Sequence, residues 1–195
     1  TAQSGVPAKA PVTPALVSRL PKVGTTIFSV MSALAADKGA VNLGQGFPDD
    51  PPPPALLAAL AQASAEKSHQ YPPMAGLPEL RRAVAGFYAR SQGLDLSPEG
   101  VIVTSGATEA VASAILAVVA PGDEVVLFSP AYDAYAPMVR RAGGVPVFVP
   151  LRPPHWQYDR TVIEAAISPR ARAIIVNDPL NPTGTVASAD ELAML

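Results

Sequence analysis

The sequence contains no cysteine and only two histidines among its 195 residues. Without cysteine the chain forms neither disulfide bridges nor thiolate metal sites, and the redox compartment stays open. The two histidines, His69 and His155, lie far apart in the sequence, and no metal-ligand spacing connects them. We therefore expect no metal centre.

Charged residues and long apolar runs are scarce as well. Only 15% of the residues are charged, the formal net charge is -2, and at most two basic residues are adjacent. This balance argues against nucleic acid or an anionic membrane surface as the main partner. The longest apolar run, residues 110–120, is too short to span a bilayer, and the first residues lack the apolar segment of a signal peptide. These absences predict a soluble, cytoplasmic protein.

Proline, by contrast, is abundant. The chain has 23 prolines, which is about 12% against a typical ~5%. Many of them lie in the first 80 residues, so we expect this part to be extended and rich in loops, with residues 1–24 forming an irregular arm. Hydrophobic residues make up 49% of the chain, which is enough for a sizeable buried core.

The second half of the sequence alternates Val- and Ile-rich runs with helical patterns. Strands are expected at residues 100–106, 123–130, 145–150 and 171–178, with helices at 107–120, 131–144 and 161–168 between them. Earlier helices are expected at 25–39, 55–67 and 77–93. Alternation of this kind predicts an α/β fold whose parallel sheet is covered on both faces. In such sheets ligands bind beyond the carboxyl ends of the strands.

The first of these strand ends carries the residues Ser105, Gly106, Ala107 and Thr108. Free N–H groups and the dipole at a helix start favour an anion, and glycine lets the backbone approach a phosphate. Glu109 makes a polyphosphate less favourable there. Ordinary capping of the helix by Ser105 or Thr108 is the simpler interpretation of this segment alone. Neither the P-loop pattern nor the GxGxxG dinucleotide fingerprint is present.

The other two strand ends carry a tyrosine and an asparagine. Tyr132 could stack on a heteroaromatic ring, although packing within the next helix is the commoner fate of Tyr132 and Tyr135. Asn181 lies between Pro179 and Pro182, which restrict its backbone and could aim its amide at a ligand. The same residues also describe a common β-turn. Together, the three strand ends offer what a small, phosphorylated aromatic cofactor needs.

Five stretches carry a wider resemblance, and their order and spacing match as well as their content. They are "VNLGQGFPD", "QYPPMAGLPELRRAV", "VTSGATEA", "PGDEVVLFSPAYDAYAPMVRRAGGVPVFVPL" and "NPTG", between residue 41 and about residue 187. The sequence resembles the fold-type I, pyridoxal-phosphate-dependent aminotransferases of class I/II, in the branch that includes kynurenine, glutamine and methionine aminotransferases. The resemblance implies a three-layer α/β/α large domain and transfer of an amino group between an amino acid and a 2-oxo acid.

The resemblance also implies roles for individual residues. Gly106, Ala107 and Thr108 would hold the phosphate of pyridoxal 5'-phosphate. Tyr132 would stack on the pyridine ring of this cofactor. Asn181 would donate a hydrogen bond to its phenolic oxygen.

Two further positions are implied by the resemblance to contact a partner and the substrate. Tyr71 would reach the cofactor of the partner subunit in a homodimer, and Gly46 would lie where the substrate carboxylate binds. Leu180 departs from the polar residue often found just before the Asn-Pro pair. The domain boundaries implied are residues 1–50 for the arm and part of a small domain, and 51–195 for the N-terminal part of the large domain.

The family's chemistry also needs a lysine that forms a Schiff base with the cofactor. The four lysines of the sequence are Lys9, Lys22, Lys38 and Lys67. All of them precede the phosphate-binding segment, and none matches the family motif, so we assign no catalytic residue. We expect these 195 residues to be the N-terminal portion of an enzyme, inactive alone and poorly soluble because apolar strand edges would stay unpaired.

Alternatives remain open at this point. A lyase that breaks C–S bonds at the β-carbon uses the same cofactor site, and a non-catalytic domain could keep the same fold. Regulators of that kind carry a basic DNA-binding domain ahead of the fold, for which the short arm leaves no room. A nucleotide-binding module is disfavoured because its glycine fingerprints are absent.

Overall fold

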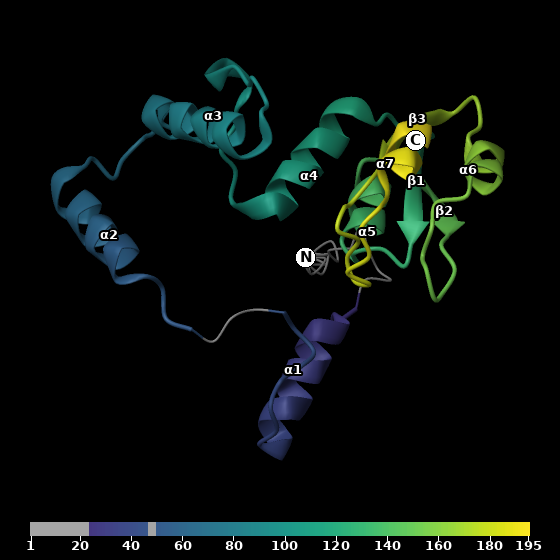
Figure 1. Ribbon diagram of the computed structural model, residues 1–195, viewed down its shortest axis with the longest axis horizontal. Helices are drawn as coiled ribbons and strands as arrows, with labels where there is room; N and C mark the ends of the chain where they lie inside the picture. Colours follow the sequence, from purple (N-terminus) through teal and green to yellow (C-terminus); the bar gives the residue numbers. More distant parts are fainter. Residues whose placement is uncertain (1–23, 47–49) are drawn as a thin grey trace, which may run out of the picture.

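The computed structural model describes residues 24–46 and 50–195 (Figure 1). Most of the predicted N-terminal arm, with Lys9 and Lys22, therefore lies outside the described residues, as do residues 47–49. The helices are α1 (Ile27–Lys38), α2 (Pro54–Glu66), α3 (Pro78–Gln92), α4 (Gly106–Val118), α5 (Tyr135–Arg141), α6 (Arg160–Ala166) and α7 (Ala189–Met194). The strands are β1 (Glu124–Ser129), β2 (Val145–Pro150) and β3 (Ala171–Ile175), and Pro98–Gly100 forms a short 3-10 turn.

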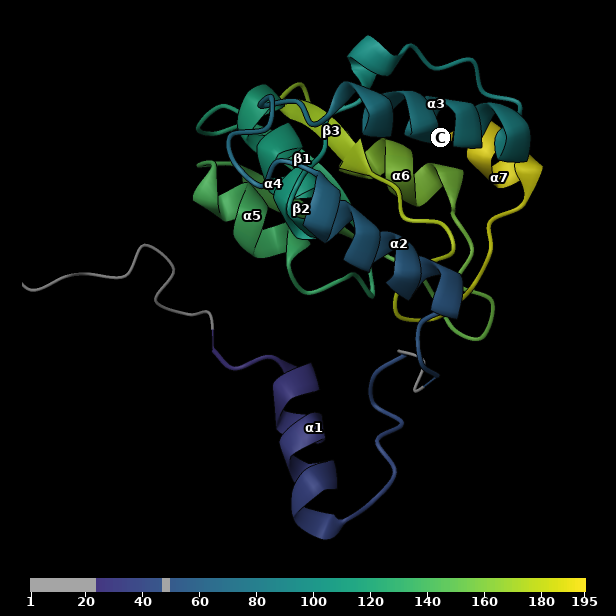
Figure 2. The same ribbon diagram turned by 90° about the vertical axis from the view of Figure 1, so that its left-hand side faces the viewer.

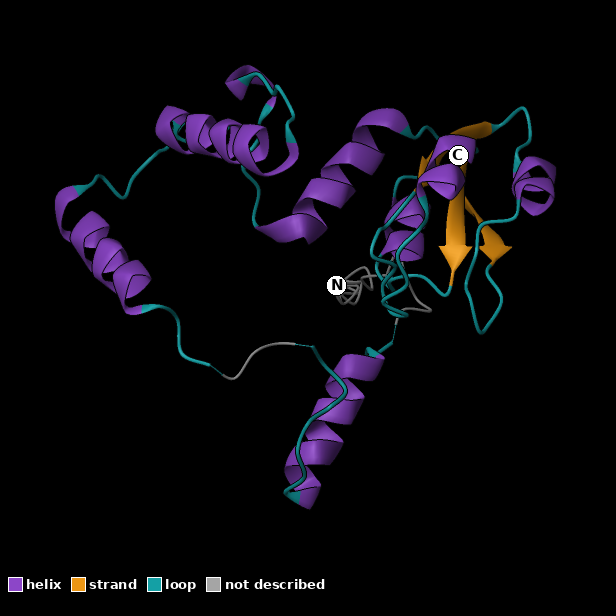
Figure 3. Ribbon diagram, in the orientation of Figure 1, coloured by secondary structure: helices purple, strands orange, loops and turns teal. Residues whose placement is uncertain are grey.

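The three strands form a parallel sheet in the order β2-β1-β3 (Figure 3). β1 and β2 pair in continuous register, with Glu124 opposite Val145. β3 pairs with the other edge of β1, and its register shifts between Glu124 and Val125. Parallel neighbours need a crossover connection, which α5 provides between β1 and β2 and α6 between β2 and β3. The predicted α/β class with its parallel sheet is confirmed.

Alternate residues of β1 build the core on the two faces of the sheet. Val125 and Leu127 pack with apolar residues of α4 and α5, whereas Val126 and Phe128 pack with β2 and α6 on the opposite face. This follows from the two-residue period of a strand. Figure 2 shows α5 on one side of the strands and α6 and α7 on the other. The sheet therefore lies between two helical layers, as predicted.

The start of β1 is tied to the segment before β3 by a buried acid. The Glu124 carboxylate accepts a hydrogen bond from Ser168 Oγ at 2.5 Å and forms an ion pair with Arg170. The Glu124 amide also donates to the Arg170 carbonyl at 2.8 Å. The Ser168 hydroxyl, followed by the Arg170 guanidinium, holds the pKa of Glu124 below its usual value.

The strand predicted at residues 100–106 is wrong. Residues 101–104 have no strand assignment, and Ile102 is 70% exposed. The segment is held by single hydrogen bonds: Val103 N donates to Ala75 O at 3.0 Å, and Arg81 Nε donates to Val101 O at 2.9 Å. A β-branched run becomes a strand only when a neighbour pairs with it, and no described strand pairs with this one.

The predicted helices are confirmed, and their ends follow the expected signals. The Thr26 side chain caps α1, which ends at Gly39 in the left-handed conformation. Pro78 opens α3, which ends at Gly93 in the same conformation. α5 starts at Tyr135, later than predicted, so that Tyr132 lies in the loop ahead of it. In Figure 1, α1 and α2 stand apart from the sheet, and neither contains a buried residue.

Candidate functional site

A pocket of about 380 Å³ lies beyond the carboxyl ends of β1 and β3, next to the first turn of α4. Its volume falls within the range of ~300–1,000 Å³ typical of small-molecule sites. Its lining combines two backbone positions at the helix start, two tyrosines, two asparagines and two apolar side chains: Ala107, Thr108, Val111, Tyr132, Tyr135, Met138, Asn177 and Asn181. The lining contains no carboxylate, lysine, arginine or histidine side chain, so its polar groups are dipoles.

Gly106 gives the helix start beside this pocket its shape. It opens α4 with φ at 82°, a conformation that glycine adopts without strain. Its N–H donates to Thr104 O at 2.9 Å. The preceding residue, Ser105, is the N-cap by position, but its side chain makes no capping hydrogen bond. Instead, the Glu109 carboxylate turns back and accepts a hydrogen bond from the Ser105 amide.

The next two amides, those of Ala107 and Thr108, remain available. The first N–H groups of a helix have no acceptor within the helix. Over the described ranges 24–46 and 50–195, neither amide finds another acceptor. Both residues line the pocket at the positive end of the helix dipole. Simple side-chain capping therefore does not account for this segment, and two N–H donors are free for an anion.

Two tyrosines form one wall of the pocket. The rings of Tyr132 and Tyr135 meet edge to face, with centroids 5.5 Å apart and an interplanar angle of 75°. Both side chains are half-buried. Burial, followed by the neighbouring phenol of Tyr132, raises the pKa of Tyr135, so this phenol stays protonated at neutral pH. The pair presents a fixed aromatic surface to a flat ligand.

The turn that carries Asn181 is closed by its own hydrogen bonds. Leu180 N donates to Thr185 O at 2.8 Å, and Gly184 N donates to Leu180 O at 2.7 Å. The Asp178 carboxylate accepts a hydrogen bond from Ala187 N at 2.8 Å and joins the two ends of the loop. The peptide bonds that precede both bracketing prolines are cis. The segment is thus a turn closed between Leu180 and Gly184, and Asn181 within it lines the pocket.

Asn177 lines the same pocket and was missed by the sequence reasoning. It follows β3 by two residues, is half-buried, and within the described part of the chain its side chain has no hydrogen-bond partner. The sequence placed it inside a strand expected to run to residue 178. A polar residue four positions before Asn181, next to the end of an apolar run, was the signal that could have identified it.

The other predicted site residues do not lie in this pocket. Tyr71 is 95% exposed, in the loop between α2 and α3, with φ at 50°. Gly46 is exposed and precedes the undescribed residues 47–49. The two described lysines, Lys38 at the end of α1 and Lys67 after α2, are absent from the pocket lining.

The described residues show neither a cluster of metal ligands nor a helix that could span a membrane. Within residues 24–46 and 50–195, no group of three or more histidine, aspartate or glutamate side chains is arranged to hold a metal ion. No helix in the same ranges has the length and apolar character needed to cross a membrane.

Comparison with known proteins gives consistent matches. The family model described as aminotransferase class I and II matches residues 38–195. Probable N-succinyldiaminopimelate aminotransferase DapC of Mycobacterium tuberculosis is 51% identical over 182 residues, which are 92% of this chain and 46% of that protein. Methionine aminotransferase of Escherichia coli is 44% identical over 179 residues, which are 91% of this chain and 46% of that protein.

Solved structures agree with these matches. The structure of YbdL from Escherichia coli, described with a methionine aminotransferase function, matches with a TM-score of 0.88 at 43% identity. That match covers 94% of this chain and 48% of the other. The Mycobacterium tuberculosis enzyme matches with a TM-score of 0.86, over 92% of this chain and 48% of the other. The chain thus spans about half the length of the curated relatives it matches.

Proposed function

The chain belongs to the class I and II aminotransferases, and from this premise we propose that it forms the phosphate- and ring-binding part of a pyridoxal 5'-phosphate site. The whole protein would move an amino group between an amino acid and a 2-oxo acid. The observation that carries the proposal is the single pocket in which two free helix amides, an aromatic wall and two carboxamides meet. The family match supports the reaction class.

The residues of the pocket fit this cofactor in three respects. The free N–H groups of Ala107 and Thr108, at a helix start, suit a phosphate monoester. The Glu109 carboxylate one residue further on disfavours a longer polyphosphate. Tyr132 offers a flat surface to the pyridine ring, and the amides of Asn177 and Asn181 supply donors to oxygen atoms on the ring.

Each residue then has a distinct task. Bound pyridoxal phosphate supplies an aldehyde that takes up the amino group and a ring that stabilises negative charge next to it. The amides of Ala107 and Thr108 hold the phosphate and fix the register of the ring. Tyr132 covers one face of the ring and excludes water from it. The Asn181 amide donates to the phenolic oxygen and favours its deprotonated form.

We propose that the remaining groups of the site come from outside this pocket. Neither of the two described lysines, Lys38 and Lys67, lines the pocket, and none of the four lysines of the sequence matches the family motif, so we propose that the lysine that the reaction requires lies outside these 195 residues. Tyr71, exposed and absent from the lining of its own chain's pocket, would reach the cofactor of a second copy in a homodimer. Gly46 would lie against the substrate carboxylate. A cytoplasmic location stays a prediction.

The amino-acid substrate is proposed only as a class. The names of the matched relatives refer to N-succinyldiaminopimelate, methionine, kynurenine and aspartate. All four names describe the transfer of an amino group, and they differ in the compound that they name. The pocket residues described here face the cofactor in our proposal, and they do not select between these side chains.

The experiment that tests the proposal uses the intact protein that contains this chain. Pyridoxal phosphate is titrated while its absorbance is followed, and the loaded protein is then mixed with an amino acid and a 2-oxo acid. We expect saturable binding and formation of a new amino acid. Asn181→Ala should weaken binding by about threefold to tenfold, the effect of losing one hydrogen bond.

A matched control sharpens this test. Gln62 also carries a carboxamide, but it lies exposed on α2, where its amide donates hydrogen bonds to the Glu66 carboxylate. Gln62→Ala should leave pyridoxal phosphate affinity unchanged. Equal affinities of wild type and Asn181→Ala would remove Asn181 from the site, and absence of any saturable binding would overturn the proposed function.

A further inference from the structure

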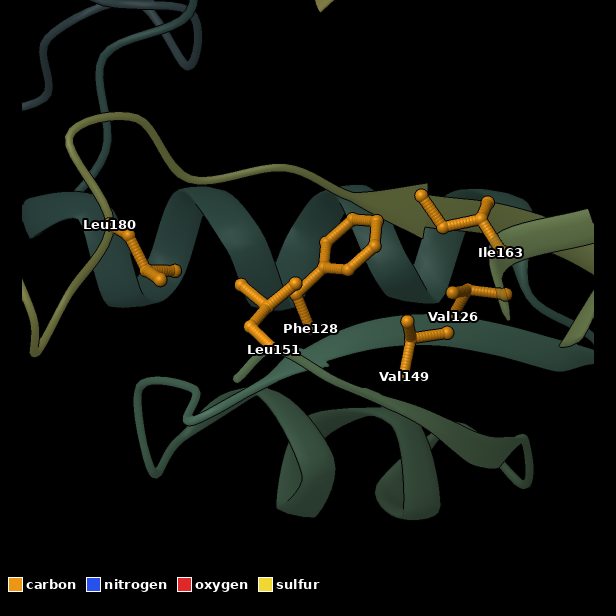
Figure 4. Packing of buried hydrophobic residues seen from close by; sticks show 6 residues of the cluster. All are labelled: Val126, Phe128, Val149, Leu151, Ile163 and Leu180. Carbon is orange, nitrogen blue, oxygen red and sulfur yellow. The ribbon is translucent and has the colours of Figure 1, made fainter. Parts of the chain in front are cut away.

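Two neighbouring residues of the turn after β3 serve opposite sides of the sheet. Leu180 is only 5% exposed and belongs to the apolar cluster on the α6 face, whereas Asn181 lines the pocket next to α4. Figure 4 shows the Leu180 side chain pointing toward Leu151 and Phe128 of this cluster. The cluster consists of Val126, Phe128, Val149, Leu151, Ile163 and Leu180.

Leu180 is the buried residue of its loop. All residues from 176 to 188 are described, and every other one of them is exposed or half-buried. Backbone hydrogen bonds make the turn a closed unit, because Leu180 binds Thr185 through its N–H and Gly184 through its carbonyl. We expect such a unit to move as a whole when its attachment to the core changes. Leu180 attaches the turn to the core through its apolar side chain.

We propose that Leu180 is a positioning residue that holds the Asn181 amide at the pocket by anchoring the turn in the core. The inference rests on the proposed function, since Asn181 is taken as the donor to the cofactor. A polar side chain at position 180 would enter an apolar cluster and lose its hydrogen bonds to water. This chain therefore holds position 180 by apolar packing.

The position of Leu180 also limits how much its side chain can contribute to the affinity for the ligand. The turn places Asn181 next to Leu180 in sequence, so loss of the anchor lets the carboxamide sample orientations that do not contact the ligand. The affinity for the ligand then falls because binding must also restrict the Asn181 carboxamide to one orientation, which costs entropy. Since Leu180 does not line the pocket, its removal costs at most what removal of the Asn181 amide costs.

The test is a double-mutant cycle on pyridoxal phosphate affinity in the intact protein. The variants are Leu180→Ala, Asn181→Ala and the double variant, with Ile163→Ala as the control. Ile163 belongs to the same cluster and is 4% exposed, but it lies on α6 and does not line the pocket. Both alanine variants in the cluster should lower the melting temperature, because both leave a cavity in the core.

The expected results separate positioning from stability. Leu180→Ala should weaken affinity at least about twofold, and by no more than Asn181→Ala does, whereas Ile163→Ala should not change it. In the Asn181→Ala background, the effect of Leu180→Ala should vanish. Leu180→Met keeps the apolar volume and should restore the affinity. If Leu180→Ala does not fold, Leu180→Val carries the same comparison with a smaller cavity.

Three outcomes would overturn the inference. They are equal affinity losses in Leu180→Ala and Ile163→Ala, an undiminished effect in the Asn181→Ala background, and unchanged affinity in a folded Leu180→Ala protein. A wild-type protein that does not bind pyridoxal phosphate would overturn the proposed function instead. Amide hydrogen exchange at Leu180 and Gly184 then tests separately whether Leu180 anchors the turn. In Leu180→Ala, exchange should become faster at these two amides and stay unchanged in α4.

Discussion

Gly106 opens α4 with φ at 82°, and a Cβ added there would meet no atom within 4 Å. Replacement by alanine therefore tests the backbone conformation of the helix start without introducing a clash. An L-residue in the left-handed region costs about 1–2 kcal/mol. Because the entropy of unfolding grows with chain length, each kcal/mol should lower the melting temperature of the longer intact protein by less than the roughly 2–4 °C typical of 150–250 residues. The helix start recovers part of this energy if it turns to negative φ.

Such a turn would redirect the amides of Ala107 and Thr108. We therefore expect Gly106→Ala to weaken the binding of pyridoxal phosphate by about tenfold, as for the loss of one charge-assisted hydrogen bond to the phosphate. The assay is an absorbance titration of the intact protein, together with thermal unfolding followed by circular dichroism. Inorganic phosphate as competitor reports whether the loss lies at the phosphate end.

Two glycines provide matched controls. Gly39 ends α1 with φ at 58° and has equal room for a Cβ, so Gly39→Ala should lower stability by a similar amount with unchanged affinity. Gly100 has room for a Cβ and no positive φ, so Gly100→Ala should change neither quantity. A Gly106→Ala protein with lowered stability and wild-type affinity would refute the assignment of this helix start to the phosphate.

The remaining predictions concern an overlooked amide and an acid. Asn177→Ala should weaken pyridoxal phosphate affinity by about threefold to tenfold, measured by the same titration; an unchanged affinity would show that Asn177 lines the pocket without contacting the ligand. Because Ser168 and Arg170 lower the pKa of Glu124, its contribution to stability is present above pH 4.5, the unperturbed value, and is lost as the pH falls through the lowered value. Urea unfolding between pH 6 and 2 should show a weaker acid dependence for Glu124→Gln than for wild type, and parallel curves would contradict this.

Much of the fold could be predicted because its signals are local. Val125, Val126, Leu127 and Phe128 form an unbroken apolar run, which is typical of a strand buried on both faces. Pro78 and Gly93 mark the two ends of α3 through their fixed or permissive backbone angles. Each of these residues determines its own conformation, so the sequence suffices.

Other features depend on partners that are distant in the sequence. Residues 101–104 have the composition of a strand, but no described strand pairs with them, and composition does not reveal pairing. The order β2-β1-β3 likewise follows from tertiary packing. The burial of Leu180 was hidden for the same reason, because its neighbours in the core come from β1, β2 and α6.

The candidate site was predictable in part. Ala107, Thr108, Tyr132 and Asn181 were singled out at three predicted strand ends, of which the first is not a strand, and one pocket contains them all. Asn177 was missed because β3 ends at Ile175, earlier than its apolar pattern indicated. The cofactor-binding roles of all these residues stay predictions, and those of Tyr71 and Gly46 depend in addition on groups outside this pocket.

A crystal structure of the intact protein with pyridoxal 5'-phosphate tests the central claim most directly. We predict the phosphate on the amides of Ala107 and Thr108, the pyridine ring against Tyr132, and the phenolic oxygen within hydrogen-bond distance of the Asn181 amide. A cofactor whose phosphate lies away from the first turn of α4, or whose ring contacts neither Tyr132 nor Asn181, would contradict the account.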